Sequence, residues 1–435
     1  MIVRGGTLVM PEGVVPGDLA IEDGRISAIA PELPGAAQEI DARGLTIFPG
    51  LIDVHVHFNE PGRTEWEGAA TGSSALAAGG GTLFFDMPLN SSPCTVNGAA
   101  FDAKRAALEQ ASYTDFALWG GIVPGNLEAL PELAERGVIG FKAFMADSGL
   151  PEFPRSDDRT LYQGMCAAAH LGLPVAVHAE NNELVAPAGH TMRDYLDSRP
   201  VLAEVEAIAR AAQLAREAGA KLHIVHISSG RGVAEALEAR ARGADISIET
   251  CAHYLHFTEE DMLRIGAVAK CAPPLRPAAD RDALRAALLR GEIDIVGSDH
   301  SPAPLSMKQD ENFFRVWGGI AGVQSTLAVL LECGANIASV AAANPARRFG
   351  IAGKGRLAVG HDADFTLVDL KQHYTVTAGT LFQRHGLSPY LGAQFRGAVR
   401  CTVLRGETVF VDGKIVGRPR GRMVKPTHAT ARIHT

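Results

Sequence analysis

Two histidines one residue apart follow an apolar run near residue 50. Residues 46–52 have the composition of a buried strand, and Asp53-Val54-His55-Val56-His57 continues directly from them. A strand sends alternate side chains to one face, so His55 and His57 point the same way at its C-terminal end. Two imidazoles that converge there form half of a divalent metal site, and nitrogen donors suit zinc. Such a pair is also common at surface and structural positions, so the inference of a metal site depends on further ligands.

Four further residues of ligand type lie downstream, each in or at the end of its own β-rich segment. They are Lys142, His178, His226 and Asp299. Any single buried histidine is by default a core residue satisfied by hydrogen bonds. Four histidines, a lysine and an aspartate that come from five different strands are difficult to explain in that way. The set therefore predicts one polar centre that holds metal.

Lys142 is the unusual member of this set, because an ammonium cannot bind a cation. Phe141 and Phe144 flank it, and an apolar setting favours the neutral amine. A neutral amine can add carbon dioxide to become a carbamate, and that anion can bridge two metal ions about 3.5–4 Å apart. The alternative for this lysine alone is an ordinary pair with a carboxylate, and only the histidines favour the carbamate.

The residues between 51 and 350 alternate short β-rich segments with helical ones. We expect strands at residues 51–57, 82–86, 115–121, 138–144, 174–178, 221–226, 245–249 and 294–299, with helical periodicity between them, for example at 201–218 and 281–289. Such β–α units predict an α/β fold, a (β/α)8 barrel of the TIM type, since parallel strands require helical crossovers. The C-terminal strand ends of such a barrel meet on one face, which gathers the six candidate ligands. His223 is out of phase with His226 and is expected to face the helices.

The two ends of the chain have a different pattern. Residues 1–47 contain short β-rich segments separated by Glu12-Gly13, Pro16-Gly17 and Asp23-Gly24, which are typical of hairpin turns. Strand-like segments return at 363–368 and 401–416. Neither end is long enough to bury a core alone, so we expect a small discontinuous β-sandwich made of both. The predicted domains are residues 1–50 plus 352–435 for the sandwich and residues 51–351 for the barrel.

Composition excludes several classes of protein. The 435 residues are 46% hydrophobic and 21% charged, with a net charge of -8, and no Lys/Arg cluster is long enough for nucleic acid. No apolar run reaches membrane-spanning length, and the N-terminus has no signal-peptide pattern. The six cysteines are scattered without a C-x-x-C pair, as in a protein with reduced thiols. We expect a cytoplasmic protein with a small-molecule substrate and no nucleic-acid or membrane partner.

Five segments of the sequence carry motifs of a known family. They are Pro49-Gly50-Leu51-Ile52-Asp53-Val54-His55-Val56-His57, Gly140-Phe141-Lys142-Ala143-Phe144, Val177-His178-Ala179-Glu180-Asn181, His226-Ile227-Ser228-Ser229 and Ser298-Asp299-His300-Ser301-Pro302. With them the chain resembles the cyclic amidohydrolases of the amidohydrolase superfamily, which include dihydroorotases, hydantoinases and allantoinases. The resemblance covers nearly the whole chain. It implies the barrel, the sandwich and a binuclear zinc centre bridged by a carboxylated lysine.

Carried over residue by residue, the resemblance implies a role for each candidate ligand. It assigns one zinc ion to His55, His57 and Asp299, the other to His178 and His226, and the bridge to carboxylated Lys142. Two zinc ions per subunit and carbon dioxide for the lysine are the implied cofactors. Asp299 would also be the catalytic base, which takes a proton from the attacking water and returns it to the leaving ring nitrogen. Relatives are commonly tetramers, so the resemblance also implies a homo-oligomer.

Five further segments indicate which branch of this family the chain resembles most. They are Phe58-Asn59-Glu60-Pro61-Gly62-Arg63, Asp86-Met87-Pro88-Leu89-Asn90-Ser91, Ser198-Arg199-Pro200, Trp317-Gly318-Gly319-Ile320-Ala321-Gly322 and Ser388-Pro389-Tyr390. In them the chain is most similar to the allantoinase branch, which implies a hydrolase of cyclic amides that converts allantoin to allantoate. Dihydroorotases usually carry arginine in place of Asn59, to hold a substrate carboxylate. Hydantoinases carry a tyrosine shortly after the carboxylated lysine, where this chain has Asp147.

The expected substrate contacts are loop residues near the strand ends. They are Asn59, Asn90, Ala272, Gly318 and His300. Amide and backbone groups of rigid loops can bind the edges of an imide ring. His253 also follows a strand end and is a candidate for a substrate or supporting contact. Two alternatives stay open. One is the same chemistry on another ring, as in a hydantoinase, dihydropyrimidinase or dihydroorotase, and the other is a non-catalytic scaffold.

Overall fold

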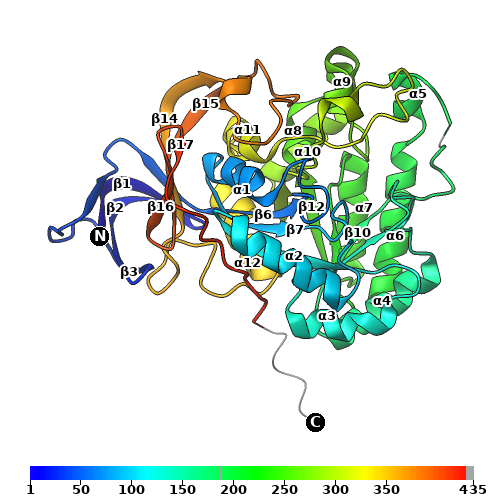
Figure 1. Cartoon of the computed structure of the whole chain (residues 1–435), viewed down its shortest axis with the longest axis horizontal. Coiled ribbons are helices and arrows are strands. Elements are labelled where there is room, and N and C mark those ends of the chain that lie inside the picture. The colour runs from blue at the N-terminus through cyan, green and yellow to red at the C-terminus, as the bar shows by residue number, and fades with distance from the viewer. Residues whose placement is uncertain (187, 428–435) are drawn as a thin grey trace, which may run out of the picture.

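The structure is a computed structural model that describes residues 1–186 and 188–427. Figure 1 shows its two units: a β-sheet unit on the left, which contains segments from both chain ends, and a barrel wrapped by helices on the right. Within the described residues, no helix combines the length and the apolar composition that a membrane crossing requires. The six cysteines are free, as the sequence predicts.

Eight parallel strands form the barrel, and they follow one another in chain order. They are β6 (Leu51–Val56), β7 (Gly81–Asp86), β8 (Asp115–Gly121), β9 (Gly140–Phe144), β10 (Val175–His178), β11 (Leu222–Ile224), β12 (Ile246–Cys251) and β13 (Ile295–Gly297). A parallel bridge between Val56 and His300 links the first strand to the segment after the last. Each predicted strand overlaps one of these, so the predicted barrel is confirmed.

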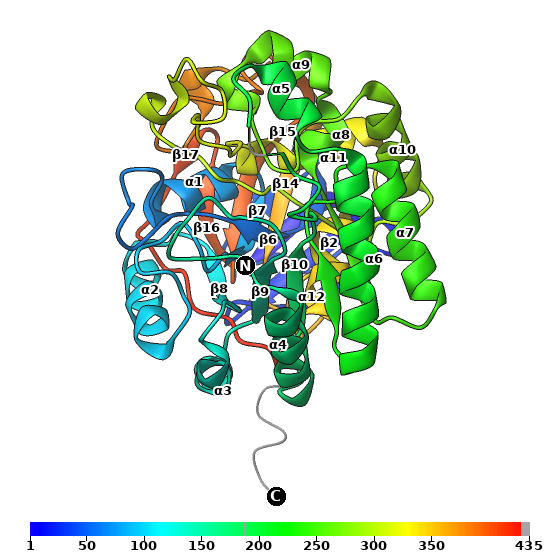
Figure 2. The same cartoon turned by 90° about the vertical axis from the view of Figure 1, so that its right-hand side faces the viewer.

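Helices surround these strands (Figure 2). They are α1 (Ala69–Ala78), α2 (Gly98–Ala111), α3 (Leu130–Arg136), α4 (Asp158–His170), α5 (Met192–Asp197), α6 (Val201–Ala218), α7 (Gly230–Ala241), α8 (Ala252–His256), α9 (Glu259–Ile265), α10 (Ala278–Leu289), α11 (Thr326–Cys333) and α12 (Asn344–Arg348). The longest, α6, shows why they form: Ala203, Ala207, Ala211 and Ala215 recur every four residues and are buried. Gly219 ends that helix in the left-handed conformation, which glycine adopts without steric cost.

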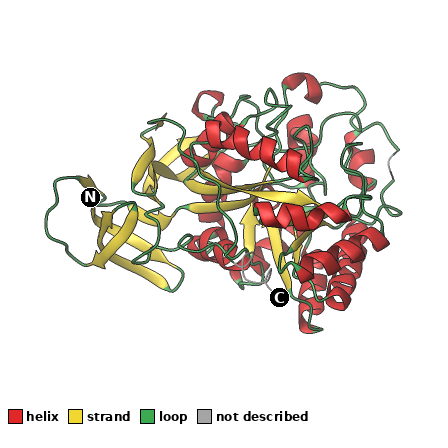
Figure 3. Ribbon diagram, turned by 60° about the horizontal axis from the view of Figure 1, so that its bottom comes forward, coloured by secondary structure: helices red, strands yellow, loops and turns green. Residues whose placement is uncertain are grey.

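The two chain ends together build one mixed sheet of nine strands, seen on the left of Figure 3. Its strands are β1 (Ile2–Met10), β2 (Gly13–Glu22), β3 (Arg25–Ala30), β4 (Glu39–Asp41), β5 (Thr46–Pro49), β14 (Phe365–Thr375), β15 (Gln394–Leu404), β16 (Glu407–Val411) and β17 (Lys414–Ile415). The order is β17-β16-β15-β14-β5-β1-β2-β3, with β4 beside β1. The antiparallel pair β5–β14 joins the two ends, as expected for a discontinuous unit. The exact domain boundaries stay a prediction.

One of the three predicted turns is wrong. Asp23 and Gly24 form the β2–β3 turn, and both have the positive φ that such a turn requires. Pro16 and Gly17 instead lie inside β2. Pro16 lies opposite Thr7 of β1, but β3 pairs only with Asp18 and the residues after it, so the other edge of the strand is unpaired at the proline. Proline is tolerated there because no ladder hydrogen bond needs its missing N–H.

A buried cluster of charge ties the barrel to the sheet of the chain ends. The ammonium of Lys354 lies 2.8 Å from Asp115, 3.0 Å from Asp362 and 2.5 Å from Asp364. Asp115 begins β8, whereas the other two aspartates lie just before β14. Burial alone would lower the pKa of Lys354, but the three carboxylates raise it above its ordinary value. The ammonium is therefore charged at pH 7, and it occupies the centre of a carboxylate group whose spacing alone would suit a metal ion.

We expect Lys354→Met to lower the free energy of unfolding by about 3–5 kcal/mol, because it leaves the buried carboxylate of Asp364 without a cation, whereas Asp115 keeps its pair with Arg405. The loss should be full at pH 7, since a group with a raised pKa contributes its stability below its unfolded pKa. Chemical denaturation of the variant beside Lys371→Met, which removes an exposed ammonium, measures the difference. Equal stability of the two variants would contradict this role for Lys354.

Candidate metal centre

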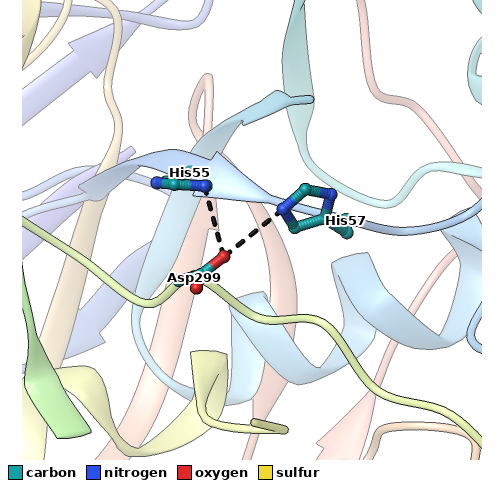
Figure 4. A group of neighbouring side chains, drawn as sticks. All are labelled: His55, His57 and Asp299. Atoms are coloured by element: carbon teal, nitrogen blue, oxygen red, sulfur yellow. Dashed lines mark ion pairs between the residues drawn. The ribbon is translucent and has the colours of Figure 1, made fainter. Parts of the chain in front are cut away.

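His55, His57 and Asp299 form the first part of the predicted centre (Figure 4). The Oδ1 atom of Asp299 lies 3.2 Å from His55 Nε2 and 3.3 Å from His57 Nε2. One potential ligand atom from each of the three residues lies within 4.8 Å of the others. All three side chains are buried, and the structure thus brings together one carboxylate and two imidazoles from the two ends of the barrel sheet.

His178 and His226 form the second part. His178 Nδ1 lies 3.0 Å from His226 Nε2, so at most one of these two nitrogens carries a proton. The ring of His226 also lies 5.4 Å from the ring of His55, centroid to centroid, which places the two parts side by side. Phe144 stacks on the His178 ring at 4.5 Å and fixes its plane.

Lys142 lies in β9 and has no exposed surface. Its Nζ atom lies 4.9 Å from the centre of the Phe144 ring, and it has no hydrogen-bond partner among the described residues. Burial lowers the pKa of Lys142 to about 7, although Glu249 and Asp299 oppose that shift. A large share of the lysine is therefore a neutral amine near pH 7, the form that can add carbon dioxide.

Three imidazoles of the centre, those of His57, His178 and His226, favour the neutral form. Burial lowers the pKa of His57, of His178 and, most strongly, of His226. Asp299 offsets part of this effect at His57, and Glu180 does so at His178. A neutral imidazole is the form that binds a metal ion. The charge state of the rings thus suits a metal site.

Glu249, at the end of the seventh barrel strand, supports the first histidine from behind. Its Oε1 atom lies 2.9 Å from His55 Nδ1, and its Oε2 atom lies 2.7 Å from His223 Nε2. Burial alone would raise the pKa of Glu249, but His55 and His223 hold it below its ordinary value. A carboxylate on Nδ1 leaves Nε2 of His55 free to face Asp299 as a ligand. Sequence reasoning did not assign Glu249 a role, although an acid at the end of a barrel strand is a visible signal.

His223 does not face the helices, so that prediction is wrong. Its ring is fully buried inside the barrel, stacked on Trp119, and its Nδ1 atom lies 2.8 Å from Ser247 Oγ. The alternation rule fails here because β11 ends at Ile224 and His226 has a positive φ of 41°. Once the strand has ended, residues three apart no longer point in opposite directions.

Glu180 is the second supporting carboxylate that sequence reasoning left without a role. Its Oε2 atom lies 2.8 Å from His178 Nε2 and also accepts a hydrogen bond from Arg199. Burial alone would raise the pKa of Glu180, but Arg199 and His178 hold it below its ordinary value. The contact leaves Nδ1 of His178 to face His226, and an acid two residues after a ligand histidine is the signal for it.

Left-handed backbone conformations gather at this centre. Asn59, Asn90, His226 and Asp299 have φ values of 63°, 71°, 41° and 45°. Such a conformation costs about 1–3 kcal/mol for a residue with a side chain and persists only where the surroundings impose it. All four are residues that the sequence nominates as ligands or substrate contacts, which supports a functional reason for the strain.

The two predicted amide contacts are buried near the barrel mouth. Asn59 donates weakly from Nδ2 to the carbonyl oxygen of Pro302 at 3.4 Å, and its Oδ1 atom has no partner among the described residues. Asn90 donates to Ser301 Oγ at 3.3 Å. An unpaired buried acceptor is costly, so Oδ1 of Asn59 is available to a donor such as a ring N–H.

The other three expected contacts differ in their surroundings. The ring of His300 is fully buried, and its Nδ1 atom accepts hydrogen bonds from the N–H groups of Gly322 and Val323. Its imidazole is thus engaged with the loop, and its carbonyl accepts from His57 N at 2.8 Å. Ala272 is half-buried and Gly318 is exposed. All three remain predictions as substrate contacts.

The residues fit a metal centre. Imidazole nitrogens converge with a carboxylate oxygen, and supporting carboxylates orient two of the rings. Lys142 Nζ and His57 Nδ1 are buried and lack partners within residues 1–186 and 188–427. Buried polar atoms without partners need an explanation, and carboxylation of the lysine with metal bound beside it supplies one for Lys142.

Known proteins resemble this chain along its whole length. A model of the amidohydrolase family matches residues 46–409. The chain is 65% identical to a protein of Solibacter usitatus named allantoinase, covering 100% of this chain and 99% of that protein. A protein of the same name from Rubrobacter xylanophilus is 54% identical, and the match covers 98% of this chain and 97% of that protein. Another, from Deinococcus radiodurans, is 52% identical, and the match covers 98% of each.

Among solved structures, the chain is similar to the L-hydantoinase (dihydropyrimidinase) from Arthrobacter aurescens. The TM-score is 0.94 at 33% identity, covering 98% of this chain and 99% of that one. A dihydropyrimidinase from Brevibacillus agri gives a TM-score of 0.88 at 28% identity, with 98% of each chain covered. These structures have the same architecture as this chain and are named for action on other rings.

Proposed function

The chain belongs to the amidohydrolase family, and from that premise we propose that it opens the cyclic amide of allantoin by hydrolysis to give allantoate. The observation that carries the proposal is the 65% identity to a protein named allantoinase over the whole chain. A buried group of imidazoles, a carboxylate and a lysine at the barrel mouth supports it. The similarity to several proteins named allantoinase makes this chain a hydrolase of cyclic amides and argues against a non-catalytic scaffold.

We propose that the centre holds two zinc ions. The expected ligands are His55, His57 and Asp299 for one ion and His178 and His226 for the other, with carboxylated Lys142 between them. When bound, the ions would polarise the substrate carbonyl and acidify a water molecule. Carbon dioxide would supply the carboxyl group of the lysine.

Asp299 is the proposed proton carrier. Burial alone would raise its pKa, but His55 and His57 beside it hold the pKa of Asp299 below the ordinary value, so it is ionised and can accept a proton. As the water oxygen bonds to the ring carbonyl carbon, Asp299 accepts a water proton. It then returns that proton to the ring nitrogen while the ring C–N bond breaks. Glu249 keeps His55 oriented throughout.

The barrel mouth suits a neutral ring better than an anionic one. Asn59 offers an oxygen without a partner in residues 1–186 and 188–427, which accepts an N–H but repels a carboxylate. The nearby guanidinium of Arg63 donates to the carbonyl of Asn90 and is already paired with Glu152. A substrate carboxylate would therefore lose water without gaining a free cation.

We expect allantoin to be hydrolysed with a kcat/KM at least about a hundredfold above that for dihydroorotate, from a difference of roughly 3 kcal/mol. The reason is the missing cationic partner for the carboxylate of dihydroorotate. Parallel assays of the metal-loaded protein on allantoin, hydantoin, dihydrouracil and dihydroorotate measure the order of preference. The same protein treated with a chelator is the control for metal-independent hydrolysis.

Two results would overturn this assignment. One is an equal rate on allantoin and dihydroorotate. The other is no rate on allantoin from protein with full metal content. A clear preference for hydantoin or dihydrouracil would favour the activity named for the similar solved structures. A homotetramer, which the family resemblance implies, is part of the proposal, and sedimentation equilibrium tests it.

A further inference from the structure

A polar pocket lies at the end of the barrel opposite the candidate metal centre. It has a volume of about 450 Å³ and is lined by residues that begin β11, β12 and β13, together with parts of α7 and α12. The ligand candidates His226 and Asp299 come after the C-terminal ends of β11 and β13, so the length of the strands separates the two sites. Small-molecule sites commonly have volumes of about 300–1,000 Å³, and this pocket is within that range.

Two ion pairs build the wall of this pocket. Arg240 pairs with Asp294, whose Oδ2 atom also accepts from Ile248 N at 2.8 Å. Arg348 pairs with Asp245 and donates to the carbonyl of Leu222 at 2.6 Å. These contacts tie α7 and α12 to the beginnings of the strands, which is a structural role typical of this face of a barrel. Each pair joins one arginine to one aspartate, so the two pairs together add no net charge to the pocket.

Two further cations of the pocket have no such role. Lys221 precedes β11, and Arg347 lies in α12. Among the described residues, neither lies within ion-pair distance of a carboxylate, and Arg347 donates only to the side chain of Asn344, at 2.9 Å. In addition, Nε of Arg348 is a buried donor without a partner in the described part of the chain. The pocket therefore carries two uncompensated positive charges and spare donors.

We propose that this pocket binds a small dianion, either a tetrahedral oxyanion or a short dicarboxylate. Two unit charges of opposite sign would balance Lys221 and Arg347, and the planar guanidinium of Arg347 suits two oxygen atoms of one group. A cation is excluded by the net charge of the lining. The proposal is independent of the ring that the metal centre hydrolyses.

Isothermal titration of the full-length, metal-loaded protein with sulfate, and separately with succinate, tests the proposal and separates the two kinds of dianion. Chloride keeps the ionic strength constant. We expect one ion bound per chain in at least one arm. The double variant Lys221→Gln, Arg347→Gln should weaken that binding at least about tenfold, because it removes both charge-assisted contacts. Its turnover should equal that of the wild type, since neither residue belongs to the metal centre.

The matched control is Lys414→Gln, Arg418→Gln, which removes the same charge from exposed positions at the C-terminal end of the chain. This variant should bind the dianion as the wild type does. Equal binding by both double variants would place the ion elsewhere, for example at the metal centre, and would overturn the proposal. Failure of the wild type to bind either ion would overturn it as well.

Discussion

Lys142→Ala is expected to reduce turnover at least about 10³-fold, the upper end of the loss seen when one electrostatic stabiliser of a reaction is removed. The reason is that the carboxylated amine is proposed to bridge both metal ions, so the variant should also lose at least one ion per chain. Turnover on allantoin together with elemental analysis of the purified protein measures both effects.

Rescue experiments separate this role from a structural one. A short carboxylic acid such as acetate can enter the space left by the side chain and supply the missing carboxylate, so it should restore part of the turnover of Lys142→Ala. Ethylamine, which restores the amine without the carboxylate, should not do so under air depleted of carbon dioxide. Full metal content in Lys142→Ala would contradict the bridging role. Circular dichroism of the variant checks that the barrel is intact.

The local signals for the proposed metal ligands are strong, and the structure brings His55, His57 and Asp299 together as the sequence predicts. Each of His55, His178 and Asp299 stands at or just after the end of a β-rich segment, and parallel strands bring such ends to one face. The regular alternation of strands and helices determines the rest of the barrel. In β6 the pairing register shifts between Asp53 and Val56 and the strand ends before His57, yet His55 and His57 both face Asp299.

Predictions fail where regular structure stops. His223 and His226 illustrate this, because β11 is only three residues long and the chain then enters a left-handed conformation. Pro16 shows the same limit in the end sheet, since its turn-like sequence lies on an unpaired strand edge. Whether a backbone N–H has a hydrogen-bond partner depends on how the strands pair in the folded chain. The local sequence around Pro16 does not determine that pairing.

Supporting carboxylates were missed for a different reason. Glutamate can itself bind zinc, but the importance of Glu249 and Glu180 comes from contacts with those ring nitrogens of His55 and His178 that face away from the neighbouring candidate ligands. The tautomer of a ligand histidine is set by such contacts. A rule that pairs each predicted ligand histidine with an acid at a neighbouring strand end or two residues away would have found both.

Asp299→Asn is expected to lower turnover at least about 10²-fold, the low end for the loss of a general base. The amide keeps the size of the side chain and an oxygen atom that can face His55 and His57, but it cannot accept the water proton. The residual rate should rise with pH, because hydroxide from the solvent then replaces the missing base. Rates on allantoin across a range of pH, measured beside the metal content, test this expectation.

The metal content of Asp299→Asn distinguishes loss of the proton carrier from loss of a metal ligand. Reduced turnover with both ions retained isolates the proton-carrying role, because the ligand role is then preserved. Asp197→Asn, which makes the same change at an exposed position in α5, should leave turnover unchanged. Near wild-type turnover of Asp299→Asn with intact metal would contradict the proposal, since the proton would then have another carrier. His253 would be the next residue to test, because both of its buried ring nitrogens lack partners in the described chain and burial lowers the pKa of His253 to about 4, which leaves a neutral ring that can accept a proton.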